Sequence, residues 1–325
     1  MNSLDLSICI VNWNAESFLV DCLNSILKAQ PTLDYELVVV DNASTDQSVR
    51  RVKDLFPQVH LIVSEKNGGF AAANNLALKE AAGRHLLLLN PDTLVMPRSL
   101  EAMVEFMDSN QEAGACGCRL FHPETGRVEA SARPRVTLPA LLWHLSYLDL
   151  LFPASRVFNK YRLTYLSASK PQPVDWITGA CLMVRNKIFR DVGSLDENMF
   201  MYWEDAEWCY RMKRAGWDIY YLPLVKIAHY RGQSSRMRTK TQVTSLSGWA
   251  TRQYTASLIY FYYKHFGKGR AQLLRLIIIA TSILKAFLWA LGGLAMPGNP
   301  QSGQRVRSYL AMIPAAVSSR GSAKG

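Results

Sequence analysis

Three carboxylates lie within four residues of one predicted helix, at Glu204, Asp205 and Glu207. Apolar residues then recur at helical spacing, which predicts the face that packs inward, at Trp208, Met212 and Ala215. Asp205 lies one turn before Trp208 on that side, where the positive end of the helix favours the ionised form that a general base needs. Acidic first turns are also common for dipole reasons alone. The helix by itself therefore indicates no particular reaction.

Three polar clusters follow predicted strands and supply side chains of the kind that bind nucleotides and metals. They occupy residues 41–46, 67–75 and 90–93. Gly68 and Gly69 in the second cluster allow a ligand to approach the backbone closely. Each cluster taken singly is equally well explained by turn and capping chemistry. Three clusters at one edge of a sheet favour a ligand site.

The elements that must position these clusters are predicted from alternating patterns. Apolar strand-like runs cover residues 4–11, 37–40, 59–63 and 86–89, and helical patterns separate them at 18–26, 46–55 and 70–82. This β-α-β order predicts an α/β fold, Rossmann-like, with a mostly parallel sheet and helices on both faces. Ligands bind outside the carboxyl ends of the strands in such sheets. The expected domain spans residues 1–235.

Residues 131–175 interrupt the regular pattern and form a possible acceptor-side insertion. Their apolar patch at 141–148 is either a partner-facing surface or a helix packed on the domain. A strand from Ile177 to Val184 is predicted to resume the core.

The charge is unevenly distributed along the chain. The 325 residues carry a net charge of +11, yet no acidic residue follows Asp218, whereas fifteen lysines and arginines do. A basic tail attached to an acidic body indicates an anionic partner, either membrane lipid or nucleic acid. The apolar stretches of the tail, residues 236–325, favour lipid, so no nucleic-acid partner is expected.

The tail contains an apolar segment at residues 276–296 in which only Lys285 is charged. Its length is just sufficient to span a bilayer. The charge near its centre, Gly292 and Gly293 favour a helix that lies in the membrane interface over one that spans it, and a plain packed helix remains an alternative. Residues from about 318 are predicted to be disordered.

Cysteine usage and the start of the chain bear on location. The six cysteines form no C-x-x-C pair and read as buried small hydrophobic residues. The first residues lack a signal-peptide pattern. We expect a cytoplasmic protein, peripheral on the inner face of the cell membrane.

An anionic diphosphate ligand would explain the polar edge. Asp41 could accept a hydrogen bond from a base or ribose, and Asp92 could hold a divalent metal that bridges two phosphates. Asp205 could deprotonate an attacking hydroxyl. His229 could complete the metal coordination, although a lone histidine more often has a structural role.

The order and wording of these segments resemble the family 2 glycosyltransferases of the GT-A fold, and their rhamnosyltransferase-like branch in particular. The resemblance covers roughly residues 4–235. It rests on seven segments: 10–14, 40–46, 67–75, 89–93, 178–181, 204–205 and 229–234. As a set they are specific, whereas any one is weak.

The resemblance implies a role for each part of the polar edge. The base catalyst is Asp205, and Asp92 and His229 help to hold Mg²⁺ or Mn²⁺. Trp203 and Glu204 contact the acceptor. The donor-binding residues are Asn12, Asp41, Asn42, Asp46, Asn67, Gly68, Gly69, Asn74, Asn75, Asp92, Gly179 and Ala180. The family inverts the anomeric centre by direct displacement, with no covalent intermediate.

The sequence departs from the family's acidic pair, which here reads Asn90-Pro91-Asp92. An amide replaces the first carboxylate, so metal affinity is expected to be lower. The rhamnosyltransferase-like branch is similar at this point, which favours dTDP-L-rhamnose as the donor and a lipid-linked saccharide of a cell-surface polysaccharide as the acceptor. UDP- and GDP-sugars remain alternatives.

Two other classes of function are less consistent with the residues. A nicotinamide-dependent oxidoreductase would use Asp41 on a ribose, but residues 12–16 cannot form the G-x-G-x-x-G turn. A non-catalytic membrane-docking or nucleic-acid-binding module would leave the acidic edge without a purpose, because carboxylates repel phosphate.

Overall fold

The computed structural model describes residues 4–152, 155, 157–158, 169–230, 248–295 and 300–318. The chain divides into two compact units. The first comprises Met1–Arg133, Tyr165–Glu197 and Asp205–Met237, and the second Pro134–Thr164, Asn198–Glu204 and Arg238–Gly325. The predicted disordered end and motif residues 231–234 lie outside the described residues.

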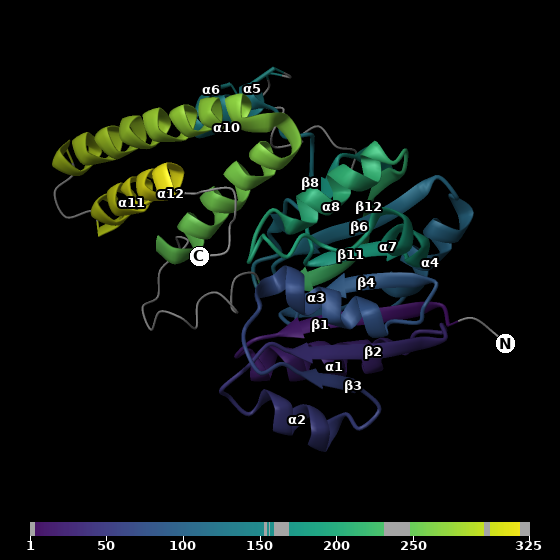
Figure 1. Ribbon diagram of the computed structural model, residues 1–325. Helices are drawn as coiled ribbons and strands as arrows, with labels where there is room; N and C mark the ends of the chain where they lie inside the picture. The colour runs from purple at the N-terminus through teal and green to yellow at the C-terminus, as the bar shows by residue number, and fades with distance from the viewer. Residues whose placement is uncertain are drawn as a thin grey trace. The chain divides into compact units, whose positions relative to one another are not determined.

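A mixed ten-stranded sheet forms the centre of the first unit, and successive strands of it can be followed in Figure 1. The order along its main path is β3-β2-β1-β4-β11-β6-β12-β5. Its strands are β1 (Leu6–Asn12), β2 (Tyr35–Asp41), β3 (His60–Val63), β4 (His85–Leu89), β5 (Thr93–Val95), β6 (Ala113–Phe121), β7 (Val128–Glu129), β9 (Gln172–Val174), β11 (Cys181–Arg185) and β12 (Asp218–His229). A separate pair consists of β8 (Ala132–Arg133) and β10 (Trp176–Ile177).

Helices and apolar side chains cover the sheet as the sequence predicts. The helices of this unit are α1 (Glu16–Ala29), α2 (Ser48–Leu55), α3 (Gly69–Glu80), α4 (Ser99–Ser109), α7 (Asn186–Val192) and α8 (Glu204–Arg214), the last beginning at the unit boundary. Leu6, Ile8 and Ile10 of β1 join the core formed with α1 and α4, whereas α3 packs on β1 and β2. The first four strands are mutually parallel, which confirms the predicted α/β sheet.

Two details of the predicted elements are wrong. The strand expected from Ile177 to Val184 is broken at Thr178–Ala180 into β10 and β11, and β11 lies antiparallel between β4 and β6. The break leaves the Gly179 N–H free of strand pairing to donate to a side chain. Ala215 is exposed because α8 ends at Arg214, so the inward stripe ends at Met212.

One close approach holds the broken strand on the sheet. A Cβ added at Gly117 of β6 would overlap Cγ2 of Ile177 and come within 3.0 Å of the Cys181 carbonyl oxygen. We expect Gly117→Ala to lower the free energy of unfolding by about 1–3 kcal/mol through overpacking. Gly303→Ala, whose added methyl meets open space, is the matched control. Equal melting temperatures for both variants would contradict this packing.

The second unit is helical. Its elements are α5 (Leu138–Leu145), α6 (Leu148–Leu151), α10 (Gly248–Ala295), α11 (Pro300–Leu310) and α12 (Met312–Ser318). Helix α10 packs against α5, α11 and α12, and Gly267 interrupts it with φ 82° and ψ 171°. The predicted patch at 141–148 spans the end of α5, a two-residue turn and the first residue of α6, and its Leu141 is buried. By length and composition, Gly248–Gly292 could cross a membrane.

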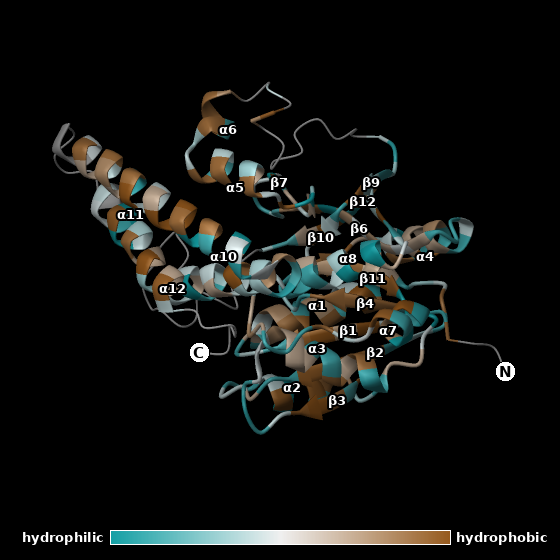
Figure 2. Ribbon diagram, turned by 45° about the horizontal axis from the view of Figure 1, so that its top comes forward, coloured by the Kyte–Doolittle hydropathy of each residue, from teal (hydrophilic) through white to brown (hydrophobic). Residues whose placement is uncertain are grey.

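From Thr281 to Leu291, α10 turns its polar side chains inward and its large aliphatic side chains outward. Lys285 is only 8% exposed, and its Nζ lies 4.1 Å from the ring centroid of Tyr147 and 5.3 Å from that of Tyr309. Seven large apolar side chains are exposed along the helix: Leu273, Leu276, Ile283, Leu284, Phe287, Leu288 and Leu291. Figure 2 shows the many hydrophobic residues of α10 in brown. The charge that weighed against a membrane-spanning helix is therefore directed into the helical bundle.

All six cysteines are free and buried. Burial raises the pKa of Cys22 and of Cys209 to about 12, and it also raises the pKa of Cys9 and Cys116. The prediction that these residues act as small core side chains is confirmed in their burial.

Candidate active site

The carboxyl ends of β1 and β2 bring Asn12 and Asp41 side by side, because the two parallel strands pair these residues in register. Asn12 Nδ2 donates to Asp41 Oδ1 at 3.0 Å, and the Ser44 N–H donates to Asp41 Oδ2 at 2.9 Å. Asp41 is only 1% exposed. Hydrogen bonds thus hold the carboxylate of Asp41, which is predicted to bind the sugar donor, at the edge of the sheet.

A ring of hydrogen bonds joins the first two polar clusters. Asn42 Nδ2 donates to Asn67 Oδ1 at 3.0 Å and to the Gly69 carbonyl at 3.2 Å. Asn42 Oδ1 in turn accepts from the Gly68 N–H at 3.0 Å. These four predicted donor-binding residues therefore lie together, and the amide of Asn42 is what holds the glycine turn at the start of α3.

The remaining polar residues of these clusters bond within the protein. Asp46 accepts from the N–H groups of Glu16 and Ser48, which joins the starts of α1 and α2. Asn74 donates to the Phe70 carbonyl. Asn75 exchanges two hydrogen bonds of 3.0 Å with the backbone of Leu195. In this structure these three side chains bind backbone groups of the segments around the site and so hold those segments in place.

Asp205 occupies the first turn of α8 and is held by backbone donors. Its Oδ2 accepts from the Gly179 N–H at 2.8 Å, and its Oδ1 accepts from the Ala206 N–H at 2.7 Å. Burial raises the pKa of Asp205 above its ordinary value of 3.8, although these hydrogen bonds oppose the rise. A carboxylate that is oriented by both oxygens and made more basic by burial is suited to accept a proton.

The backbone before Asp205 is strained, and the Phe70 side chain packs closely against Gly179, whose N–H donates to Asp205. Tyr202 and Trp203 both adopt left-handed conformations, with φ of 69° and 71°. A Cβ at Gly179 would lie 3.1 Å from the Phe70 ring. Ala180 follows in the same turn, with its carbonyl accepting from the Asn90 N–H at 3.0 Å. The predicted residues Gly179 and Ala180 therefore lie between Asp205 and the third polar cluster.

His229 lies between two carboxylates. Its Nδ1 is 3.0 Å from Glu129 Oε2, and its Nε2 is 3.3 Å from Asp92 Oδ1. The Tyr230 N–H donates to the Asp92 carbonyl at 2.9 Å and aligns the two segments. Burial lowers the pKa of His229, but the neighbouring carboxylates of Asp92 and Glu129 outweigh it and raise the value to about 9. The sequence did not indicate Glu129, which is part of a two-residue strand distant in the chain.

The Asp92–His229 pair fits a divalent cation. Asp92 Oδ1 and His229 Nε2 are buried without a hydrogen bond, and their separation suits two ligands of one ion, each about 2.1 Å from it. A bound cation would displace the proton on Nε2 and leave Nδ1–H donated to Glu129, as in many metal-bound histidines. Among the described residues no ready-made group of three His, Cys, Asp or Glu ligands occurs. Substrate oxygens and water would complete the coordination.

The two residues expected to contact the acceptor belong to the second unit. Trp203 is only 3% exposed and packs on Tyr254 and Phe261 of α10, with ring centroids 5.5 and 5.8 Å apart. Glu204 is 5% exposed. The structure therefore places Trp203 in an aromatic cluster, and Asp205, the next residue but one, in the first unit.

Comparison with known proteins identifies the family of this chain. Residues 7–193 match glycosyl transferase family 2, and the chain belongs to that family. It is 31% identical over 210 residues to N-acetylglucosaminyl-diphospho-decaprenol L-rhamnosyltransferase of Mycobacterium tuberculosis, covering 61% of this chain and 67% of the relative. It is 28% identical over 176 residues to rhamnosyltransferase WbbL of Escherichia coli, covering 52% and 63%.

A solved structure supports the fold assignment. Mannosyltransferase PcManGT from Pyrobaculum calidifontis, determined with GDP-Man and Mn²⁺, aligns over 98% of this chain and 88% of its own, with a TM-score of 0.57 and 17% identity. The predicted GT-A fold is confirmed.

Proposed function

We propose that this glycosyltransferase transfers L-rhamnose, with inversion at the anomeric carbon, from the nucleoside-diphosphate sugar dTDP-L-rhamnose to a hydroxyl of a lipid-linked saccharide. The observation that carries the proposal is the buried, doubly hydrogen-bonded carboxylate of Asp205 beside the polar edge of the sheet. The relatives named as rhamnosyltransferases support the choice of sugar, and one of them is named for a decaprenol-linked acceptor.

The bond changes of the proposed reaction balance without a covalent intermediate. The acceptor oxygen forms a bond to the anomeric carbon while its proton passes to Asp205, and the bond from that carbon to the diphosphate breaks with the electron pair leaving on phosphate. Asp41 and the Asn42–Gly69 ring orient the nucleotide. Asp92 and His229 would hold Mg²⁺ or Mn²⁺, which supplies positive charge near the leaving diphosphate.

Thermal stability with nucleotides tests the donor. The protein is heated with dTDP, UDP, GDP or NAD, each with and without Mn²⁺, because a ligand that binds the native state raises the melting temperature. We expect the largest metal-dependent rise with dTDP. A rise in melting temperature with UDP or GDP alone would replace dTDP-L-rhamnose with a UDP- or GDP-sugar as the proposed donor. A rise with NAD alone would overturn the transferase proposal.

The exposed stripe of α10 is proposed to rest on the anionic inner surface of the membrane that carries the acceptor. Seven large apolar residues face outward, and the basic residues Lys264, Lys268 and Arg270 precede them in a tail without acids. Such a helix binds an anionic surface by apolar burial together with charge.

We expect the double variant Phe287→Ser, Leu291→Ser to bind anionic liposomes at least about tenfold more weakly, because each buried side chain contributes about 1.5–3 kcal/mol. Co-sedimentation measures the bound fraction. Leu55→Ser, Leu224→Ser removes two exposed leucines of the first unit and is the control. Equal binding by both double variants would remove the stripe from the membrane contact.

A further inference from the structure

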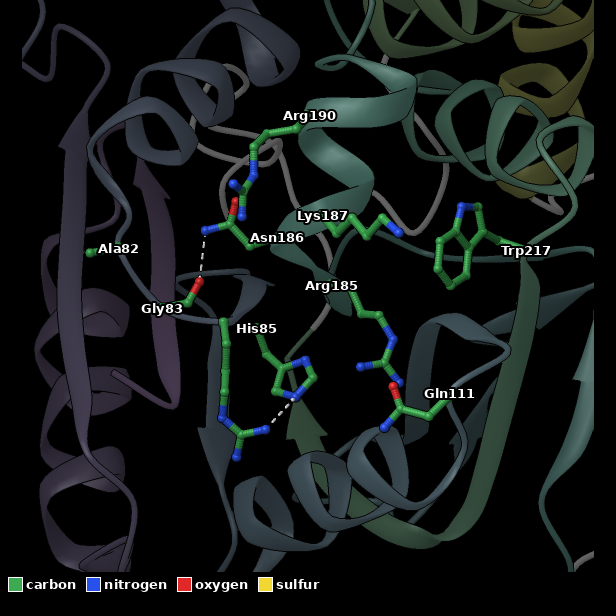
Figure 3. Close-up of a pocket in the computed structure, with 10 residues that line it drawn as sticks. Ala82, Gly83, His85, Gln111, Arg185, Asn186, Lys187, Arg190 and Trp217 are labelled. Carbon is green, nitrogen blue, oxygen red and sulfur yellow. Dashed lines mark hydrogen bonds between the residues drawn. The ribbon is translucent and has the colours of Figure 1, made fainter. Parts of the chain in front are cut away.

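A basic cavity of 550 Å³ lies at the opposite end of the strands from the polar edge. His85 is the first residue of β4 and Arg185 the last of the antiparallel β11, so both lie at that end, whereas Leu89 and Cys181 lie at the other. The cavity is hollowed between these strands, the start of α7 and Trp217 (Figure 3). Its residues have no part in the proposed transfer reaction.

The positive charge around the cavity is only partly neutralised. Arg84 is paired with Asp5 and Asp108. Arg185 is held by backbone carbonyl oxygens of Met107, Asn110 and Ala113, which orient it without cancelling its charge. Asp108 and Glu112 are the acids that act on Arg185, and burial lowers its pKa because the surroundings compensate its charge incompletely.

Two further cations extend this charge to the mouth of the cavity. Lys187 and Arg190 are exposed, and among the described residues neither forms an ion pair. Lys187 Nζ lies 5.9 Å from the ring centroid of Trp217, so one wall combines a cation with an aromatic face. Figure 3 shows Arg190 extending beside Asn186, and Lys187 extending away from Asn186 towards Trp217.

The floor of the cavity holds a ring nitrogen without a partner. His85 is 1% exposed, and its Nε2 lies 2.9 Å from Asp108 Oδ1 and 3.3 Å from Arg84 Nη1. Its Nδ1 is buried and has no hydrogen-bond partner among the described residues. Burial lowers the pKa of His85, which favours the neutral ring. A hydroxyl group of a ligand can both donate and accept, so it would satisfy Nδ1 in either tautomer.

We propose that this cavity binds a small phosphate ester, with its phosphate between Lys187, Arg190 and Arg185 and its hydroxyl-bearing part towards His85 and Trp217. Its volume lies in the range of small-molecule sites and exceeds what inorganic phosphate fills. Because the site is separated from the donor edge by the length of the strands, ligand and donor nucleotide bind at the same time.

Calorimetric titration in EDTA tests the site, since chelation of divalent metal removes metal-dependent binding at Asp92. The probes are inorganic phosphate, glucose 1-phosphate and thymidine monophosphate. We expect an ester to bind more tightly than phosphate, and Lys187→Ala, Arg190→Ala to weaken it at least tenfold. Lys28→Ala, Lys53→Ala removes the same charge from exposed positions outside the cavity and should leave binding unchanged.

Hydrogen exchange locates the bound ligand, with protection expected at residues 186–190. Absence of binding, or equal weakening in the control variant, would overturn the proposal. A lipid headgroup carries the same phosphate, so vesicles that contain phosphatidic acid form a second arm. Protection of residues 186–190 by vesicles alone, lost in the double variant, would support the phosphate site and assign its source to lipid.

Discussion

Asp205→Asn is expected to reduce the rate of sugar transfer by about 10²- to 10⁴-fold while donor binding is retained, because the amide cannot accept the acceptor's proton. The amide also places an NH₂ group against one of two backbone donors, Gly179 N–H or Ala206 N–H, so one hydrogen bond is lost. Single-turnover transfer and nucleotide titration measure the two effects separately. Transfer at the wild-type rate would remove Asp205 from the role of base.

The matched control is Glu207→Gln on the same helix. Glu207 is fully buried and bound by Arg211, so its loss should lower the melting temperature yet leave the rate per folded molecule close to normal. Such a result would separate the base from a general requirement for carboxylates in α8.

Acidity provides a second test of Asp205. Burial raises the pKa of the folded state above 3.8, so the native protein binds this proton more tightly than the unfolded chain. The group therefore stabilises the fold below pH 3.8, and this contribution is lost as pH rises through the raised pKa. As pH rises from 3.8 through the raised pKa, the melting temperature of Asp205→Asn should increase relative to that of the wild type. The rate of transfer by the wild type should increase over the same pH range.

Asp92→Ala is expected to abolish the Mn²⁺-dependent part of nucleotide binding, because it removes one of the two buried groups that face each other at 3.3 Å. Glu129→Gln keeps the shape but alters the group that orients His229, and should weaken metal binding about 10- to 100-fold. Calorimetric titration of Mn²⁺ in the presence of dTDP measures both effects. Glu124→Gln, an exposed residue before the same short strand, is the control.

Metal binding unchanged in Asp92→Ala would refute the assignment of the ligand pair. Metal binding unchanged only in Glu129→Gln would leave the pair in place and reduce Glu129 to an ordinary salt-bridge partner of His229.

The parallel half of the sheet could be predicted because each strand is a continuous apolar run between helical patterns. Residues 37–40 and 86–89 are buried on both faces, and this is what produces such runs. The polar clusters followed directly, since consecutive parallel strands deliver their carboxyl ends to one edge. The orientation of β11 could not be predicted, because an apolar strand reads the same whether its neighbours run with it or against it.

The features that the sequence could not predict depend on contacts between residues far apart in the chain. Glu129 reaches His229 across 100 positions of the chain from a strand too short to show any period. The inward turn of Lys285 depends on Tyr147 and Tyr309, neither of which periodicity could associate with it. Local patterns predict elements, whereas such pairs are fixed only when the elements pack.

The burial of all six thiols means that thiol reactivity can be used to follow unfolding. Alkylating reagents and mild oxidants act on accessible thiolates, and none of the six cysteines is exposed. The native protein should therefore resist such reagents, and the appearance of reactive thiols during heating would report unfolding of the sheet itself. A single cysteine introduced at an exposed position, such as Leu224→Cys, could be labelled selectively without removing any native one.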